Sequence, residues 1–578
     1  GGQLELAGDL NINAVSYVNL DAGTTNSLSD SGSELLFADT GAKIDLIQHA
    51  ADILVSGGSV INNLGKLNEH LKLNISDEDA WQTILQKGEE VARVLRTFGQ
   101  GEENNVFGIE SSSGGSGYDL YLNYHVSEIE LINPDQGLVI TNNDLENAES
   151  LTAKLSGSGK ITLAGGTILL GDGSEEGNVN TGEVIVTGTV VAGNYNAFGN
   201  GSTLTVNGGT ADFGDYSQVL ESLYSTGTLI GSSSGTITIK GEMEIEGSNN
   251  EFSSNIIFDT ETATSGTSHD VDALGGGKIT ISDNYTLVVD DTEGGKLDNV
   301  IEGSGVLVVG TDESKPTSGS IELSGNNKGF TGDINVKDGW MLTAEMDADE
   351  TAADHIGTGS LELDSGSNAG FTQTGGGLNW NSTVTGEGNL ILTADANQSI
   401  RVSGGLENFS GSVTVSGGRF DLGDGNEAAL HETDLVAAGG NTTITVLDTD
   451  DQVWVEGDFA VTDDADIVFN TPATPGTISD ASLKVHGKLD LTGADITVHV
   501  DDSLTPGTPG TDSLTVQDIL SEDRSSSLSL VIAEADGGIG NYTGDLTILN
   551  SKGETVDLGS KGIAINDAEG NRIATGYY

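Results

Sequence analysis

Short runs in which apolar and polar residues alternate recur along most of this 578-residue chain, and glycine or an Asn/Asp turn separates each run from the next. Clear examples are residues 160–163 (KITL), 202–206 (STLTV), 236–240 (TITIK) and 278–281 (KITI). Alternation with a period of two predicts β-strands that bury one face. The runs follow one another too closely for helices to fit between them, so the pattern excludes βαβ units and favours an all-β fold.

Two motifs repeat within this pattern. The unit G-x-G-x-[L/I]-x-[L/V] occurs at 157–163, 303–309, 357–363 and 386–392. The unit N-x-[F/Y]-[T/S]-G-x-[I/V/L]-x-[V/I], with one variable gap, occurs at 326–336, 408–415 and 541–548. Tandem units of this kind predict a right-handed parallel β-helix of roughly 20 to 25 residues per coil. Its strands would stack about 4.8 Å apart, with glycine and asparagine at left-handed corners.

The two units taken together resemble the repeat of bacterial autotransporter passenger domains, in particular the AIDA-like and antigen-43-like adhesins. The resemblance is clearest from about residue 150 to 423 and recurs at 541–548. It implies a type V secreted passenger that is displayed on the bacterial cell surface, anchored by an outer-membrane barrel expected C-terminal to this segment. It also implies a role in cell adhesion, aggregation and biofilm formation. The expected partner is a surface polysaccharide or other glycan, or another copy of the chain on a neighbouring cell.

Residues 42–99 depart from the strand pattern. Their apolar residues follow helical spacing, at Ile44, Ile47, Ala51 and Leu54 and again at Ile84, Val91, Leu95 and Phe98. We therefore expect a small helical insertion near the N-terminus. Near the other end, prolines interrupt the strands and predict longer loops. The expected division is first β-helix coils over 1–41, the helical insertion over 42–99, a central parallel β-helix over 100–470, and C-terminal coils with longer loops over 471–578.

The charge of the chain restricts its partners. With 22 Lys+Arg against 89 Asp+Glu, the formal net charge is -67. Such a polyanion repels phosphate groups, so we expect no binding to nucleic acid and no direct membrane binding by this fragment. The acidic composition is typical of proteins from saline, halophilic habitats. The chain has no cysteine, which excludes disulfides and thiol nucleophiles.

Clusters of carboxylates are the strongest candidates for a metal site. Asp450 and Asp451 precede Asp463 and Asp464 by less than one coil of the expected length. Stacking could therefore bring the two pairs together as hard oxygen ligands for Ca²⁺. No EF-hand loop or nonapeptide calcium repeat is present. The alternative interpretation is a solvated acidic surface.

Three observations bear on catalysis and sugar binding. Residues 364–367 (DSGS) look like part of a serine-protease motif, but lack the leading glycine and a matched His/Asp context, so we expect an ordinary turn. Trp340, Trp380 and Trp454 are either sugar-stacking platforms or buried core. The chain is expected not to be an enzyme. The alternatives are a β-helix polysaccharide lyase or depolymerase, and a stalk that presents the helical insertion as its binding module.

Overall fold

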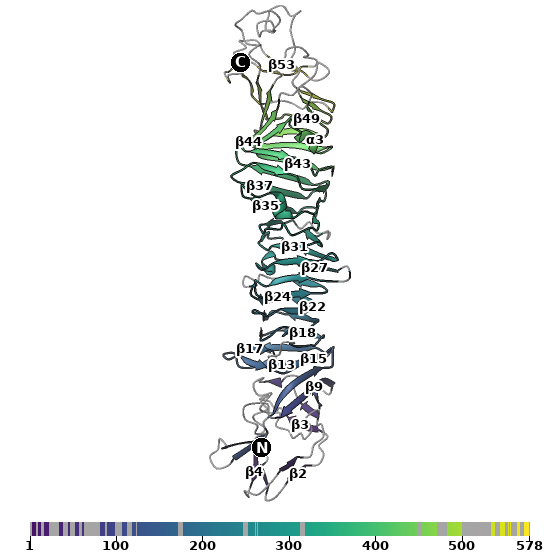
Figure 1. Cartoon of the computed structure of the whole chain (residues 1–578), viewed down its shortest axis with the longest axis vertical. Helices are drawn as coiled ribbons and strands as arrows, with labels where there is room; N and C mark the ends of the chain where they lie inside the picture. Colours follow the sequence, from purple (N-terminus) through teal and green to yellow (C-terminus); the bar gives the residue numbers. More distant parts are fainter. Residues whose placement is uncertain are drawn as a thin grey trace, which may run out of the picture. The chain divides into compact units, whose positions relative to one another are not determined.

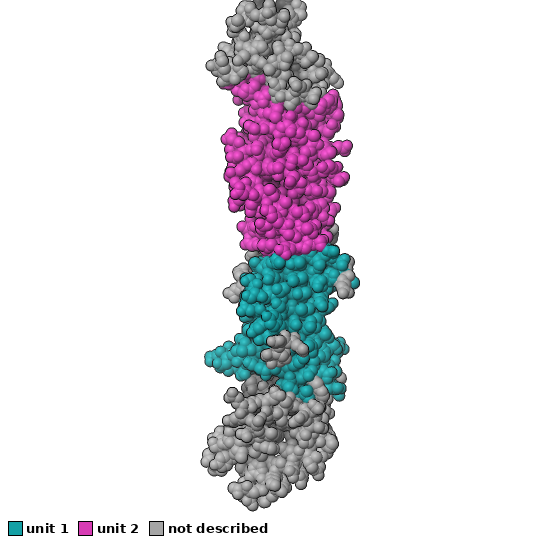
Figure 2. All heavy atoms as spheres, in the orientation of Figure 1, with its two compact units in different colours: residues 1–287 teal, residues 288–578 magenta. Residues whose placement is uncertain are grey.

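The computed structural model describes the central part of the chain and individual segments on either side of it. The central part is 124–499 with gaps at 172–176, 247–251, 261, 263, 312–317, 448–452, 471–482. The flanking segments are 3–6, 10–12, 17–21, 34–37, 44–46, 52–56, 61–62, 81–86, 89–98, 107–111, 118–122, 533–537, 544–549, 553, 555, 563–566 and 572–576. The chain divides into two compact units, 1–287 and 288–578 (Figure 2). No helix among the described residues is long and apolar enough to span a membrane.

Parallel strands, stacked coil upon coil, build both units as a β-solenoid (Figure 1). In the first unit one sheet stacks β13 (Leu138–Asn142), β16 (Ile161–Gly165), β18 (Glu183–Val186), β20 (Ser202–Val206) and β22 (Gln218–Ser225). A second sheet stacks β14 (Glu149–Leu151), β17 (Thr167–Leu170), β19 (Thr189–Ala192), β21 (Thr210–Asp212) and β23 (Thr228–Ile230). Further strands of this unit include β24 (Thr236–Ile239), β25 (Met243–Ile245), β26 (Asn255–Phe258), β27 (Thr264–Ser268) and β28 (Ile279–Ile281).

The second unit repeats the same construction. Its largest sheet includes β35 (Met341–Met346), β37 (Asn368–Gln373), β40 (Asn389–Ala394), β43 (Ser412–Leu422), β44 (Asp434–Val446), β46 (Phe459–Thr462), β47 (Asp466–Asn470) and β50 (Asp495–His499). Beside it lie β34 (Ile334–Val336), β36 (Leu361–Leu363), β39 (Val384–Gly386) and β42 (Asn408–Phe409). A third sheet contains β45 (Val453–Val455), β48 (Leu483–Val485) and β51 (Ala533–Ala535). The short helix α2 (Ala352–Ile356) lies between β35 and β36 in the chain, and α3 (Asn426–Leu430) lies between β43 and β44.

Columns of apolar side chains fill the interior of the coils. Leu138 aligns with Ile161, Ile161 with Val184, and Val184 with Leu204, and all four are at most 1% exposed. These pairings give coil lengths of 23, 23 and 20 residues. The parallel β-helix and the coil length expected from the sequence are thus confirmed. Alternate residues point outwards, so each strand buries one face only.

The two sequence motifs stack on each other. Gly303 pairs with Phe330 through a parallel bridge, and two residues further on Gly332 lies against Gly305. A Cβ atom on Gly332 would lie 1.7 Å from the Gly305 carbonyl oxygen, and one on Gly359 would lie 1.9 Å from that of Gly332. The spacing of the coils therefore leaves no room for a side chain at this position, which explains why glycine recurs there.

The asparagine of the second motif links three coils. Asn327 is 1% exposed; its Oδ1 accepts a hydrogen bond of 2.7 Å from the Ile301 N–H, and its Nδ2 donates one of 2.6 Å to the His355 carbonyl oxygen. Both polar groups of this buried amide are thereby satisfied, which a buried side chain of this kind requires.

The expected helical insertion over 42–99 is wrong. The described residues of this segment are strands, among them β5 (Ile44–Leu46), β6 (Asp52–Ser56), β8 (Trp81–Gln86) and β9 (Glu89–Phe98). Strands β8 and β9 pair in antiparallel fashion, and the pairing runs from Trp81 with Leu95 to Gln86 with Glu89. Strand β9 also pairs with β12 (Tyr124–Leu131). The apolar spacing of this segment also fits a helix. The strand pairings satisfy the hydrogen-bonding groups of its backbone, so tertiary context decides its structure.

Candidate functional site

A group of three side chains on the outer surface of the first unit has the donor types of a metal site. Strand β25 alternates buried Met243 and Ile245 with exposed Glu242, Glu244 and Glu246. The alternation places the three carboxylates on one outward face, because successive side chains of a strand point to opposite sides.

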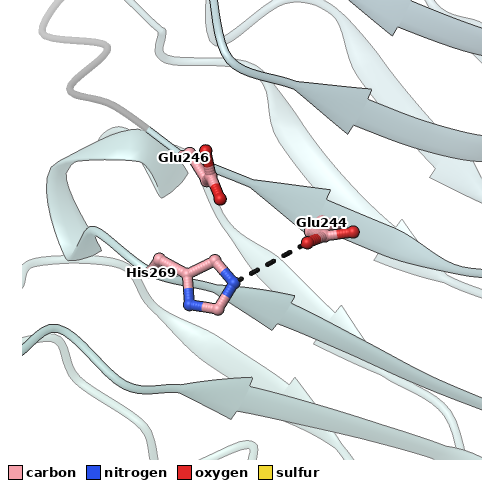
Figure 3. A group of neighbouring side chains, drawn as sticks. All are labelled: Glu244, Glu246 and His269. Atoms are coloured by element: carbon pink, nitrogen blue, oxygen red, sulfur yellow. Dashed lines mark ion pairs between the residues drawn. The ribbon is translucent and has the colours of Figure 1, made fainter.

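The next coil brings a histidine to this face. Glu244 aligns with Thr267 and Ile245 with Ser268, so that His269 lies beside Glu246 (Figure 3). The backbone N–H of His269 donates to the Ile245 carbonyl oxygen at 3.0 Å and continues the ladder. Its Nε2 lies 3.9 Å from Glu244 Oε1, and one donor atom each of Glu244, Glu246 and His269 lies within 4.8 Å of the others.

These donors select among ions. An imidazole nitrogen with two carboxylate oxygens suits zinc or a similar transition metal, whereas calcium takes oxygen ligands. Bonds of about 2.1 Å to zinc would require the three side chains to draw closer together than they are here. As placed, His269 and Glu244 are exposed partners on neighbouring coils, with Glu246 beside them. The neighbouring Glu242 accepts a hydrogen bond of 2.7 Å from the Tyr224 hydroxyl.

The calcium site expected from the sequence stays a prediction. Asp450 and Asp451 lie outside the described residues. Asp463 and Asp464 are adjacent and exposed in the turn between β46 and β47, where both adopt positive φ angles of 54° and 62°. Aspartate tolerates this left-handed conformation, so the turn accounts for both residues without an ion.

Asp466, the first residue of β47, has a carboxyl group with a raised pKa. Asp466 aligns with Asp495 in the following coil. Partial burial, and then the negative charge of Asp495, raise the pKa of Asp466 above its ordinary value. Asp495 is itself held in place, because its Oδ1 accepts a 2.9 Å hydrogen bond from the Asp545 N–H. Because Asp466 and Asp495 carry like charges and lie opposite each other, their repulsion destabilises the pairing of β47 with β50.

The three tryptophans Trp340, Trp380 and Trp454 differ in their exposure to solvent. Trp340 and Trp380 are fully buried, and the Trp380 indole N–H donates to the Ser382 carbonyl oxygen at 2.9 Å. They belong to the core. Trp454 is 39% exposed on β45, between buried Val453 and Val455.

The DSGS segment is the turn that was expected. Ser367 is buried, and its hydroxyl donates to the Asp364 carbonyl oxygen at 2.8 Å. Gly366 takes the positive φ angle of 87° that the turn requires. The Ser367 hydroxyl is thus committed to the turn.

Sequence reasoning missed the group at Glu244, although signals for it were present. The run 242–246 (EMEIE) has strand alternation, and Glu246 precedes His269 by one coil of 23 residues. A coil length of 23 residues, had it been known, would have predicted that Glu246 and His269 lie side by side.

No protein-family model matches the chain, and neither does any curated protein or solved structure. The resemblance to autotransporter passengers is therefore carried by the repeat motifs alone. The solenoid fold itself is consistent with a structural stalk.

Proposed function

We propose that this chain is a non-catalytic adhesin, a stalk of the autotransporter passenger type that is displayed outside a bacterial cell. It attaches the cell to a surface glycan or to another copy of itself, and so promotes aggregation and biofilm formation.

The observation that carries this proposal is the outward polar face of the second unit. Asn368 aligns with Asn389, and Asn389 with Ser412. The Asn389 Oδ1 accepts hydrogen bonds of 2.9 Å from the hydroxyls of both Ser412 and Thr414. The same type of group thus returns at each coil, about every 4.8 Å.

A second polar column runs beside the first. Thr372 aligns with Thr393, and Thr393 with Ser416, and all three side chains are partly exposed. A glycan or a second solenoid is also a repeating structure, so each of its units can meet an equivalent donor or acceptor. Weak contacts that are linked in this way add up to firm attachment through multivalency.

The test is retention of protein-coated beads on glycan-coated or protein-coated surfaces under flow. Replacing Thr372, Thr393 and Ser416 together by alanine is expected to reduce retention several-fold, because each contact is repeated on every bead. The control is a variant with alanine at three exposed loop positions, D349A, E407A and E432A, which should leave retention unchanged. Retention on neither surface by the wild-type protein would contradict the proposal, and release of shortened glycan would indicate a depolymerase instead.

A further inference from the structure

The outward face around Trp454 combines an exposed aromatic ring with polar groups of both kinds. Trp454 aligns with Lys484 in the next coil, and the ammonium group of Lys484 lies 4.8 Å from the ring centroid. The His486 ring meets the indole edge-to-face, with 4.8 Å between centroids and 72° between planes. The ring is thus fixed in orientation by its neighbours while 39% of the residue stays exposed.

Carboxylates complete the face. Glu456 lies two residues after Trp454 on the same side of the strand, and its Oε2 is 3.1 Å from His486 Nδ1. Asp536, in the coil after that, lies 4.0 Å from the Lys484 ammonium group. We call these five residues the Trp454 face: Trp454, Glu456, Lys484, His486 and Asp536.

Each polar member of the Trp454 face remains accessible. The side chains of Lys484 and His486 are 24% and 39% exposed, and those of Glu456 and Asp536 are 47% and 60% exposed. The face therefore offers hydrogen-bond donors and acceptors to a ligand beside a flat apolar ring. It extends over three coils, or about 10 Å.

These features match the chemistry of a sugar ring. A pyranose has an apolar face of C–H groups, which packs on an aromatic ring, and a rim of hydroxyls that both donate and accept hydrogen bonds. The two basic side chains are already matched by two carboxylates, and the whole chain carries a charge of -67. An anionic polysaccharide would be repelled, so the fitting ligand is a neutral one.

We infer that the Trp454 face is a binding site for a neutral polysaccharide, with a sugar ring stacked on the exposed part of the indole. This inference rests on the proposed adhesive function and assigns a place to its glycan contact. Glu456, Lys484, His486 and Asp536 supply the hydrogen bonds to the hydroxyl groups.

The test is native gel electrophoresis of the full chain in gels that contain dextran, xylan, galactomannan or a soluble β-glucan, with polygalacturonate as the anionic comparison. We expect at least one neutral polysaccharide to retard the wild-type protein. W454A should raise its apparent Kd about tenfold or more, since the stacking surface is lost, whereas W454F should retain most of the affinity. Y195A removes another exposed aromatic, 52% exposed, and should have no effect.

W454T is a second variant in case the alanine variant folds poorly, because threonine is common at outward strand positions here, as at Thr497. Normal affinity of a folded W454A or W454T would overturn the site and leave the adhesive function standing. Retardation by polygalacturonate alone would overturn the neutral ligand. Retardation by none of the polysaccharides would contradict the glycan partner itself, and with it the site. A loss of self-association in W454A without a change in polysaccharide binding would likewise overturn the inference.

Discussion

At the scale of single residues, close contact between coils determines which side chains are tolerated. Gly332 has a backbone conformation open to other residues, yet the Gly305 carbonyl oxygen occupies the place of its Cβ. G332A must therefore push two coils apart. We expect a loss of roughly 1 to 3 kcal/mol in stability, measured as a lower midpoint of urea denaturation.

A matched control for this substitution exists in the same unit. A Cβ on Gly440 would find its nearest atom, the Asp464 carbonyl oxygen, at an ordinary 3.7 Å. G440A should change stability by no more than about 0.5 kcal/mol. Equal midpoints for G332A and G440A would show that the coils do not approach each other as closely as described.

At the scale of elements, the pairing of β47 with β50 places two carboxylates in register. Because the pKa of Asp466 is raised in the folded protein, the folded state holds this proton more tightly than the unfolded chain does. The loss of folding stability that the ionised Asp466 causes is therefore absent at a pH below the ordinary pKa of aspartate. It grows as the pH rises through the raised pKa of the folded state. D466N should stabilise the protein at pH 7, by about 0.2 to 1 kcal/mol, and have no stabilising effect near pH 3.

The measurement is thermal or urea denaturation of wild type and D466N at both pH values. D349N, which removes a charge from an exposed turn, is the control and should show little change. A stabilisation by D466N that is equally large at acidic pH would mean that the charge of Asp466 is not its cause.

Elements also show where prediction from sequence succeeds and where it fails. Period-two alternation in runs such as 202–206 predicts the strands, because a strand that buries one face has apolar residues at every second position. The sequence predicts a helix where the structure has the paired strands β8 and β9, because a spacing of four residues, as between Val91 and Leu95, fits both a helix and a strand. In the sequence Gly88 falls between the two apolar runs, and a glycine at such a place favours a break over one continuous helix.

The site was less predictable than the fold. That Trp454 points outwards follows from its place between Val453 and Val455. Its neighbour Lys484 lies 30 positions further along the chain, well beyond the usual coil length. A partner across such a long coil has no sequence signal of its own, so the Trp454 face emerges only from the register of the strands.

At the scale of the whole molecule, the charge of -67 governs how copies of the chain meet. At about 0.01 M salt the screening length is roughly 30 Å, and like-charged surfaces repel one another before short-range contacts form. We expect clustering of protein-coated beads to increase as NaCl is raised to about 0.5 M. Millimolar Ca²⁺ should increase it further if carboxylates such as Asp463 and Asp464 bridge between copies. Clustering that weakens steadily with NaCl would instead indicate attraction to a basic partner.

Successive coils stack in parallel register, and both the polar columns and the Trp454 face follow from this register. The chain has no cysteine, so an introduced pair reports register without interference. Thr372 is aligned with Thr393, and the two point outwards about 4.8 Å apart, within the range of a disulfide. Thr372 and Ile391 also both point outwards but are displaced by two residues, at about 8 Å, beyond that range.

The deciding measurement is mass spectrometry of cross-linked peptides after mild oxidation of the two double-cysteine variants. We expect an intramolecular disulfide in T372C/T393C and none, or only traces, in T372C/I391C. A disulfide that forms as readily in T372C/I391C, or fails to form in T372C/T393C, would show that the coils do not stack in this register.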